Sequence, residues 1–340
     1  MNSRRNRKNG IRTVCSLLVG GIILSWLLSG CGGAQQTKVY RVGILSGMTF
    51  VANITDGLKA RMTELGYVEG KNISYDVQVT DFDIAKYQSI LKKFVADKVD
   101  VIFAFPTEAA LEAKAATQGT NIPVVFDYGS IEGMGLVDSV RNPGGNITGV
   151  RYPSPDIALK RFEIMLELLP GAKQVLVPYQ KGYPNVPPQL EALRPAAQAA
   201  GVKLIEVPAE NVADLKAQLQ ALAPTADNKY DAFLFLAEPL AVTVEPFTVI
   251  GKFATEYKIP MGGVLMSAGG YDSIYGVNVE GVSAGKLAAP LLDKVFKGIA
   301  VGTIPVFTPE FDISINYKVA QAQGITVPQS LLQQAKEIIR

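Results

Sequence analysis

The stretch Val99-Asp-Val-Ile-Phe-Ala-Phe105 is almost continuously apolar, and Pro106-Thr-Glu108 and an alanine-rich segment ending near Gly119 follow it directly. A short apolar run of this kind is typical of a strand whose two faces are both covered. The alanine-rich segment after it is a predicted helix. A buried strand followed by a helix is the unit from which open parallel sheets are built. This stretch therefore indicates an α/β fold.

The same unit recurs along the chain. The strands predicted before a turn at 142–146 are 40–45, 73–79, 99–105 and 122–126. The strands predicted after that turn are 174–177, 203–207 and 231–237. The length of 340 residues fits two domains. We therefore expect two Rossmann-like lobes with parallel sheets, a first crossing at 149–153, and a cleft between the carboxyl ends of the two sets of strands.

Residues that can cap helices mark where several helices begin. Asp83 and Asn211 stand directly before segments with helical apolar spacing, and both are favoured at the N-cap. Ser154 is expected to cap a helix with Pro155 at its first position. A helix is also predicted from Pro188 to Gly201, and Pro195 inside it should kink it or delay its start.

The composition excludes several classes of enzyme. The chain has no histidine and two cysteines, Cys15 and Cys31. Ser-His-Asp and Cys-His catalysis and zinc sites with His or Cys ligands are therefore ruled out. Chemistry based on carboxylates alone remains possible. We expect no enzymatic activity and no cofactor or metal.

The N-terminal segment has the layout of a secretory signal. Five basic residues precede an apolar run from Val14 to Leu28, and Leu28-Ser-Gly-Cys31 has the form of a lipoprotein cleavage site. An uncleaved anchor is the alternative, but the run of about 15 residues is short of the roughly 20 that a spanning helix needs. We expect a signal peptide at 1–30, lipid on Cys31, and a flexible tether at 31–37. The body is then held outside the cytoplasm on the cell membrane, or on the outer membrane in a two-membrane cell.

The charge balance gives no sign of a nucleic-acid partner. The net charge of +2 includes the five basic residues of the signal, and without them 28 basic residues face 31 acidic ones. No later run is apolar and long enough to span a membrane. We expect a monomer.

Eight stretches follow one another in a characteristic order, at 64–72, 99–103, 122–126, 135–137, 142–150, 168–173, 308–316 and 322–331. Together they resemble the ABC-transporter substrate-binding lipoproteins of the tryptophan/tyrosine-binding type. That resemblance implies a type I periplasmic-binding fold, crossings near 149–153, 276–281 and 305–312, a small amino-acid-like solute and a membrane permease as partner. The implied lobes are 38–150 plus 279–304 and 151–278 plus 305–340.

The sequence departs from this family where the ligand is expected. Ser46-Gly-Met-Thr-Phe50 replaces a Gln and a His-Pro, and Pro106-Thr107-Glu108-Ala109 replaces a Thr-Pro-Ala-Ala type of loop. A loop acid of the family, usually Asp, is matched by Glu238. These departures leave the identity of the ligand open.

Polar and aromatic residues near the predicted strand ends form the candidate site. Thr107 at a helix N-terminus suits a ligand carboxylate, and Glu108 beside it is interpreted first as a partner of the helix dipole. Asp127 could hold an ammonium group or cap its own loop. Tyr183 is expected to face the cleft with other aromatic residues. The full candidate set is Ser46, Thr49, Phe50, Phe105, Thr107, Asp127, Tyr128, Tyr152, Tyr179, Glu238 and Ser267.

Three functions fit these residues. The first is a solute-binding lipoprotein that captures a small ligand, with an amine and possibly an aromatic side chain, and delivers it to an ABC permease by hinge closure. The second is a lipoprotein that senses such a ligand for a membrane receptor. The third, a hydrolase built on Asp127 and Glu238, has only carboxylates to work with.

Overall fold

The computed structural model describes residues 38–225 and 228–340. Residues from Val39 to Arg340 form one compact unit. The expected signal peptide, the lipidated Cys31 and the tether lie outside the described residues. Within these two ranges, no helix is long and apolar enough to cross a membrane.

The first of two parallel sheets has the strand order β2-β1-β3-β4-β5. Its strands are β1 (Tyr40–Ser46), β2 (Ile73–Val79), β3 (Val101–Phe105), β4 (Val124–Gly129) and β5 (Ile147–Arg151). Strand β3 is buried along its whole length and pairs in parallel with β1 and β4, as the apolar run at 99–105 predicts. The β4–β5 register shifts between Phe126 and Gly129, so that the end of β4 leaves the regular ladder.

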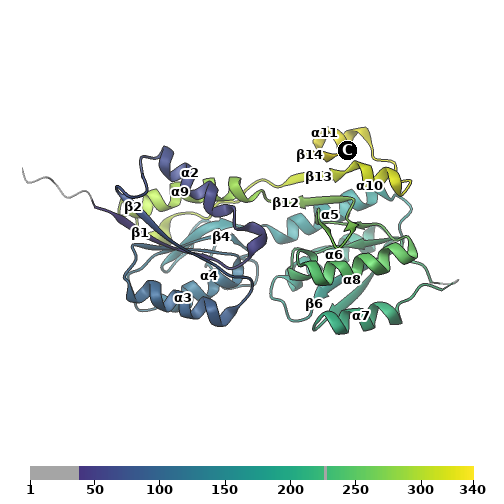
Figure 1. Cartoon of the computed structure of the whole chain (residues 1–340), viewed down its shortest axis with the longest axis horizontal. Helices are drawn as coiled ribbons and strands as arrows, with labels where there is room; N and C mark the ends of the chain where they lie inside the picture. Colours follow the sequence, from purple (N-terminus) through teal and green to yellow (C-terminus); the bar gives the residue numbers. More distant parts are fainter. Residues whose placement is uncertain (1–37, 226–227) are drawn as a thin grey trace, which may run out of the picture. The chain divides into compact units, whose positions relative to one another are not determined.

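Helices cover both faces of this sheet (Figure 1). Helices α3 (Ile84–Ala96) and α4 (Thr107–Ala116) lie on one face, and their buried side chains share a core with Leu45, Ile102 and Phe126. Helix α2 (Ile54–Glu64), preceded by the 3₁₀ turn η1 (Thr49–Val51), lies on the other face with α9 (Gly281–Phe296). We call this sheet and its four helices the first lobe.

Helix α9 comes from the last quarter of the chain and packs closely on α2. A Cβ atom added at Gly57 would lie 2.0 Å from the Val282 carbonyl oxygen, and one added at Gly285 would lie 2.0 Å from the Ile54 carbonyl oxygen. The hydroxyl of Tyr67 also donates a hydrogen bond to Asp293 at 3.0 Å. The absence of side chains at both glycines therefore lets the two helices approach backbone to backbone.

The second parallel sheet has the order β7-β6-β8-β9. Its strands are β6 (Gln174–Gln180), β7 (Lys203–Ala209), β8 (Ala232–Leu234) and β9 (Met261–Gly262). Its helices are α5 (Ser154–Leu168), α6 (Val186–Ala199), α7 (Val212–Ala221), α8 (Val244–Tyr257) and the 3₁₀ turn η2 (Pro239–Ala241). Only three residues of the predicted strand 231–237 pair in the ladder, and residues 235–237 run on toward η2.

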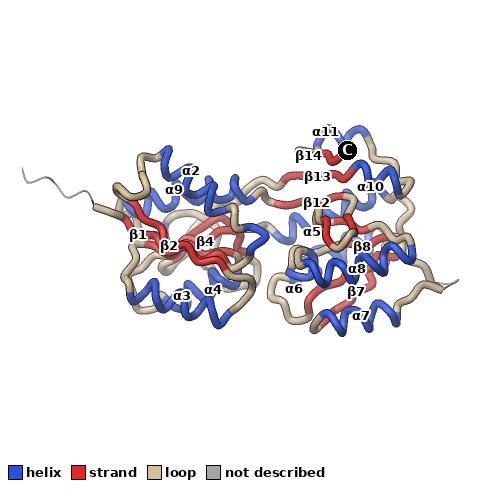
Figure 2. The backbone as a smooth tube through the Cα atoms, viewed as in Figure 1, coloured by secondary structure: helices blue, strands red, loops and turns tan. Residues whose placement is uncertain are grey.

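A three-stranded sheet of order β12-β13-β14 continues this second group (Figure 2). Its strands are β12 (Tyr275–Asn278), β13 (Asp312–Asn316) and β14 (Glu337–Ile339), and a bridge between Gly263 and Gly276 connects it to the end of β9. The remaining elements are the hairpin of β10 (Ser267–Ala268) and β11 (Tyr271–Asp272), η3 (Val301–Thr303), α10 (Tyr317–Ala322) and α11 (Gln329–Gln334). We call both sheets, α5 to α8, α10 and α11 the second lobe.

Two of the predicted helix caps are confirmed and one is wrong. The side chains of Asp83 and Asn211 accept hydrogen bonds from the backbone N–H groups of Lys86 and Asp214, at 3.1 and 3.0 Å. Ser154 does not cap α5, because it is the first helical residue and Pro153 stands at the N-cap. Its buried hydroxyl is engaged with side chains of other elements instead.

The predicted start of the helix at Pro188 is also wrong. Helix α6 begins earlier, at Val186, and continues through Pro195 to Ala199. Its first turn contains proline near the N-terminus, where the missing N–H has no intrahelical partner to lose. Pro195 therefore does not delay the helix.

Candidate functional site

A pocket whose empty space is about 480 Å³, open solvent included, lies among loops that follow the strands of both parallel sheets. The first lobe lines it with Met48, Phe50, Phe82, Pro106, Thr107 and Tyr128. The second lobe and the segments joining the lobes line it with Tyr152, Arg161, Tyr183, Asn185, Ala237, Glu238, Val242, Val264 and Asn278. Residues after β1, β2, β3, β6 and β8 therefore meet at one place, as expected for the carboxyl ends of parallel strands.

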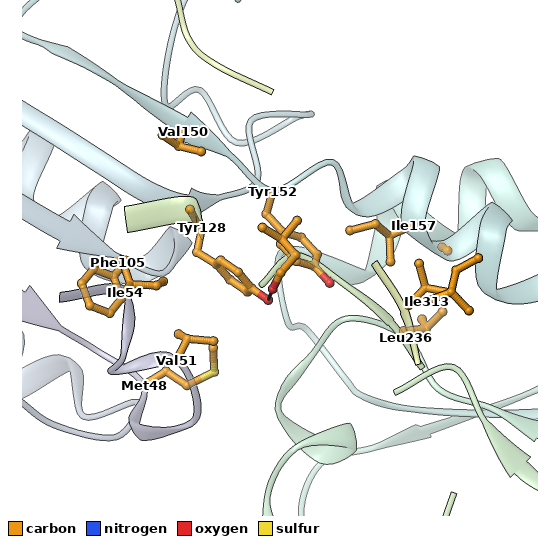
Figure 3. Packing of buried hydrophobic residues seen from close by; sticks show 14 of the residues in the cluster. Met48, Val51, Ile54, Phe105, Tyr128, Val150, Tyr152, Ile157, Leu236 and Ile313 are labelled. Carbon is orange, nitrogen blue, oxygen red and sulfur yellow. Dashed lines mark hydrogen bonds between the residues drawn. The ribbon is translucent and has the colours of Figure 1, made fainter. Parts of the chain in front are cut away.

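Tyr128 and Tyr152 converge on the side chain of Asn278. Their ring centroids are 4.5 Å apart, and Figure 3 shows the two rings side by side. Both hydroxyl groups donate to the Asn278 Oδ1 atom, at 2.6 and 2.8 Å. The backbone φ of Tyr128 is 53°, a left-handed value that a tyrosine seldom adopts, and it falls at the irregular end of β4. The bulge thus aims Tyr128 toward the end of β12.

Arg161 lies on α5 and is 1% exposed. Its guanidinium donates to the carbonyl oxygen of Val277 at 2.8 and 3.0 Å and to that of Phe235 at 3.2 Å. None of the ion pairs found in residues 38–225 and 228–340 includes Arg161. A buried positive charge without a carboxylate within ion-pair distance therefore lies at the pocket wall.

Glu238 brings a buried acid to the same pocket. It caps η2, and its carboxylate accepts hydrogen bonds from the backbone N–H groups of Gln180, Leu240 and Ala241 at 3.1 to 3.2 Å. Burial raises the pKa of Glu238 to about 7, although these three hydrogen bonds and the charge of Arg161 favour the ionised form. A group with a pKa near neutrality can change its charge when a ligand binds.

A chain of buried hydrogen bonds connects the two lobes beside the pocket. The Thr107 hydroxyl oxygen accepts from the backbone N–H of Ser130 at 2.9 Å. The Ser130 hydroxyl donates to that of Ser154 at 3.2 Å, which donates to Asn185 Oδ1 at 2.7 Å. The Asn185 amide donates to the Ala237 carbonyl oxygen at 2.9 Å. This network holds the start of α4 and the loops around Glu238 in one arrangement.

Glu108 follows Thr107 on α4, and both of its carboxylate oxygens are buried without a hydrogen-bond partner. Burial raises the pKa of this carboxyl. The nearby Tyr183 hydroxyl and the residue's own N–H oppose the rise but stand outside hydrogen-bonding geometry. Tyr183 lines the pocket and interacts with Glu108, which is itself outside the pocket lining.

Five of the eleven candidate residues line the pocket: Phe50, Thr107, Tyr128, Tyr152 and Glu238. The other six are outside its lining. Ser46 and Phe105 are buried in or beside the core at the ends of β1 and β3, and Thr49 is exposed with its backbone N–H bonded to Asp81. Asp127 is fully buried, Tyr179 donates to Glu206 at 3.0 Å, and Ser267 is an exposed hairpin residue bonded to Asp272.

Sequence reasoning missed Arg161 and Asn278. Arg161 stands four residues after Ile157 and four before Met165, which places a charged residue on the apolar face of α5, and this was the available signal. Asn278 ends a strand, where an amide side chain carries no distinctive pattern. Nor did the sequence indicate Met48, Phe82 or Val264.

Two α/β lobes with a lined pocket at their strand ends define a solute-binding protein of the periplasmic type. The chain belongs to the ABC transporter substrate binding protein family, whose model matches residues 43–339. It therefore acts as a binding protein for a small solute. Such a role implies a permease partner and an extracytoplasmic location.

Several known proteins are similar to this chain. A curated "Tyrosine-binding protein" of Clostridioides difficile (strain R20291) is 29% identical over 327 residues, 90% of each chain. A conserved domain protein of Vibrio cholerae has 27% identity and a TM-score of 0.74, over 89% of this chain and 99% of its own. A Streptococcus pneumonia ABC domain solved with L-Trp has 24% identity and a TM-score of 0.76, over 89% of this chain and 100% of its own.

Proposed function

We propose that this protein is the solute-binding component of an ABC importer and that it holds an amino-acid-like ligand in the pocket around Tyr128 and Glu238. The observation that carries this proposal is the combination of Glu238 and Arg161, two buried ionisable groups of opposite sign, with walls that are otherwise mostly aromatic and apolar. A zwitterion with an apolar side chain matches such a pocket, because each of its charges finds an opposite charge and its side chain finds apolar surface.

In this proposal the ligand ammonium lies against Glu238, and the ligand carboxylate points toward Arg161 and Asn278. Asn278 Oδ1 already accepts from Tyr128, Tyr152 and the Val279 N–H, so its amide nitrogen is the atom left to donate to a ligand. The start of α4 at Thr107 supplies further N–H groups near the pocket. The tyrosine-binding relative supports an aromatic amino acid as the first compound to test.

Calorimetric titration with amino acids tests the proposal. We expect tyrosine, phenylalanine or tryptophan to bind the purified protein, and Glu238→Gln to weaken binding by at least about tenfold, or 1.4 kcal/mol. Ser267→Ala, in the exposed β10–β11 hairpin, is the control and should bind as the parent does. Absence of binding by every amino acid, with no compound retained on purification, would overturn the proposal.

The lipid anchor on Cys31 is part of the same proposal, since it keeps the binding protein close to its permease and raises its effective concentration there. Cys31→Ser should move the protein from the membrane fraction to the soluble fraction without changing its affinity. Retention of the variant in the membrane fraction would contradict a lipid anchor at this residue.

A further inference from the structure

The carboxyl group of Glu108 makes no ion pair and no hydrogen bond within the described residues, and burial raises its pKa, which favours the neutral form. Both oxygens are buried and lack a hydrogen-bond partner, and none of the ion pairs found in residues 38–225 and 228–340 includes this residue. Burying an unpaired carboxylate costs several kcal/mol, which is why such groups are normally paired. An acid left in this state next to a ligand pocket requires an explanation.

The described groups that interact with Glu108 include tyrosine hydroxyls but no cation. Tyr87, on α3, is close enough to feel its charge, but the Tyr87 hydroxyl donates to the Gly47 carbonyl oxygen at 2.6 Å. Tyr183, from the second lobe, faces Glu108 and also lines the pocket. Glu238 is the other charged group that acts on Tyr183, and it is an acid as well. The near surroundings of Glu108 are therefore aromatic and acidic, with no cation.

The charges of the pocket and its wall favour a cationic ligand. Glu108 and Glu238 are acids, and Arg161 is the only basic residue in the pocket lining. The ammonium and carboxylate groups of a zwitterionic amino acid pair with Glu238 and Arg161. Glu108 then has no group of opposite charge on this part of the ligand. A second positive charge on the ligand is the simplest group that balances it.

We propose that Glu108 is a specificity-determining residue that binds a positively charged group on the ligand side chain, so that the preferred solute is a cationic amino acid or a close analogue. This inference rests on the proposed function, because it assumes that the amino-acid head occupies the pocket. Glu108 is outside the pocket lining, so the proposal requires the Tyr183 side chain, which interacts with Glu108, to move when the ligand binds. The Tyr183 ring then lies beside the ligand cation and adds a cation–π contact.

The simpler interpretation of Glu108 is a partner of the α4 dipole. An acid in the first turn of a helix is stabilised by the N-terminal N–H groups. That role predicts an interaction with N-terminal N–H groups, and the residue's own N–H does lower the pKa of the carboxyl, although both oxygens are buried without a hydrogen-bond partner. It also predicts no effect of Glu108 on the choice of ligand, which separates the two interpretations by experiment.

The experiment compares ligands that differ only in one positive charge. Calorimetry is performed with L-lysine against L-norleucine and with 4-(aminomethyl)-L-phenylalanine against 4-methyl-L-phenylalanine. In the parent protein, the charged member of at least one pair should bind at least about tenfold more tightly. Glu108→Gln should weaken binding of the charged ligand, so that the affinities of the two ligands in a pair differ by no more than about twofold. Glu112→Gln, one turn further along the same helix, should leave the ratio of the two affinities unchanged.

Equal affinity for both members of each pair in the parent protein would overturn the inference, and so would a ratio that Glu108→Gln leaves intact. If tyrosine and phenylalanine bind while the ratio is close to one, the inference fails and the proposed function stands. If no compound binds, both fail. Thermal denaturation of Glu108→Gln checks folding, and this variant, which keeps the shape of the neutral acid, should be about as stable as the parent.

Discussion

Replacing Glu238 with Gln should remove a pH dependence from the stability of this protein. Burial raises the pKa of Glu238 from 4.5 to about 7. The folded state therefore keeps a proton on this carboxyl at pH values where the unfolded chain has already released it. The contribution of Glu238 to the free energy of unfolding is therefore fully present below pH 4.5, and it is lost as the pH rises to about 7.

The size of the effect follows from the shift in pKa. A difference of about 2.5 pKa units at about 1.4 kcal/mol each corresponds to roughly 3 kcal/mol. A glutamine at position 238 keeps one oxygen that can accept from the backbone N–H groups of Leu240 and Ala241. We therefore expect the variant to be slightly less stable than the parent at pH 4.5 and to gain about 3 kcal/mol relative to it by pH 8.

Urea unfolding at half-unit steps from pH 4.5 to 8 measures this difference. The comparison is the free energy of unfolding of the variant minus that of the parent, so the contributions of Glu108 and Asp127 cancel to first order. Glu245→Gln, at an exposed acid on α8, is the control substitution and is measured over the same pH range. A constant difference for Glu238→Gln would show that this carboxyl is not held protonated by burial, and the reasoning would be wrong.

Three further substitutions test separate parts of the structure. Tyr152→Phe removes a hydroxyl that donates to Asn278 at 2.8 Å, so urea unfolding should show a loss of about 1 kcal/mol. Gly285→Ala places a Cβ atom 2.0 Å from a backbone oxygen and should cost about 1–3 kcal/mol, whereas Gly171→Ala, with no atom within 4 Å, should change stability by less than about 0.5 kcal/mol. Asp127→Asn keeps the acceptor for the Tyr128 N–H and should leave the affinity for the ligand unchanged in calorimetry, because Asp127 is outside the pocket lining. A loss of affinity of about tenfold or more would instead support the sequence-based prediction that Asp127 holds the ligand amine.

The strands and most helices could be predicted because a buried parallel sheet leaves a strong local pattern. Strand β3 is apolar at every position and buried at every position, so its assignment needed no knowledge of its neighbours. Asp83 and Asn211 likewise bond to N–H groups three residues away. Where the contact that determines a structural feature lies between residues close in sequence, the feature can be predicted from the sequence.

Ser154 shows where that reasoning stops. Serine before a helical pattern and a proline is a normal N-cap signal. In the structure its hydroxyl bonds to Asn185 and Ser130, residues 31 and 24 positions away. A contact between lobes therefore displaced a local one, and no local pattern distinguishes the two cases.

The same distinction explains which site residues were found. Tyr179 and Tyr183 both follow the start of β6, and the sequence favoured both for the cleft. Tyr179 still belongs to the strand, and its hydroxyl donates to Glu206 on the neighbouring strand β7. Tyr183 stands beyond the strand end and lines the pocket. The exact end of a strand decides which side chain reaches the pocket, and strand ends are the part of a prediction that is least well defined.

Arg161 shows the opposite case, in which the sequence contains a signal without its explanation. A charged residue on the apolar face of α5 signals that something unusual is buried there. Its partners are the carbonyl oxygens of Val277 and Phe235, 116 and 74 residues away, and a backbone carbonyl has no side-chain identity to recognise. The positive charge that makes this pocket suitable for a carboxylate is thus fixed by the backbone of β12 and of the segment after β8, so only the folded chain shows where it lies.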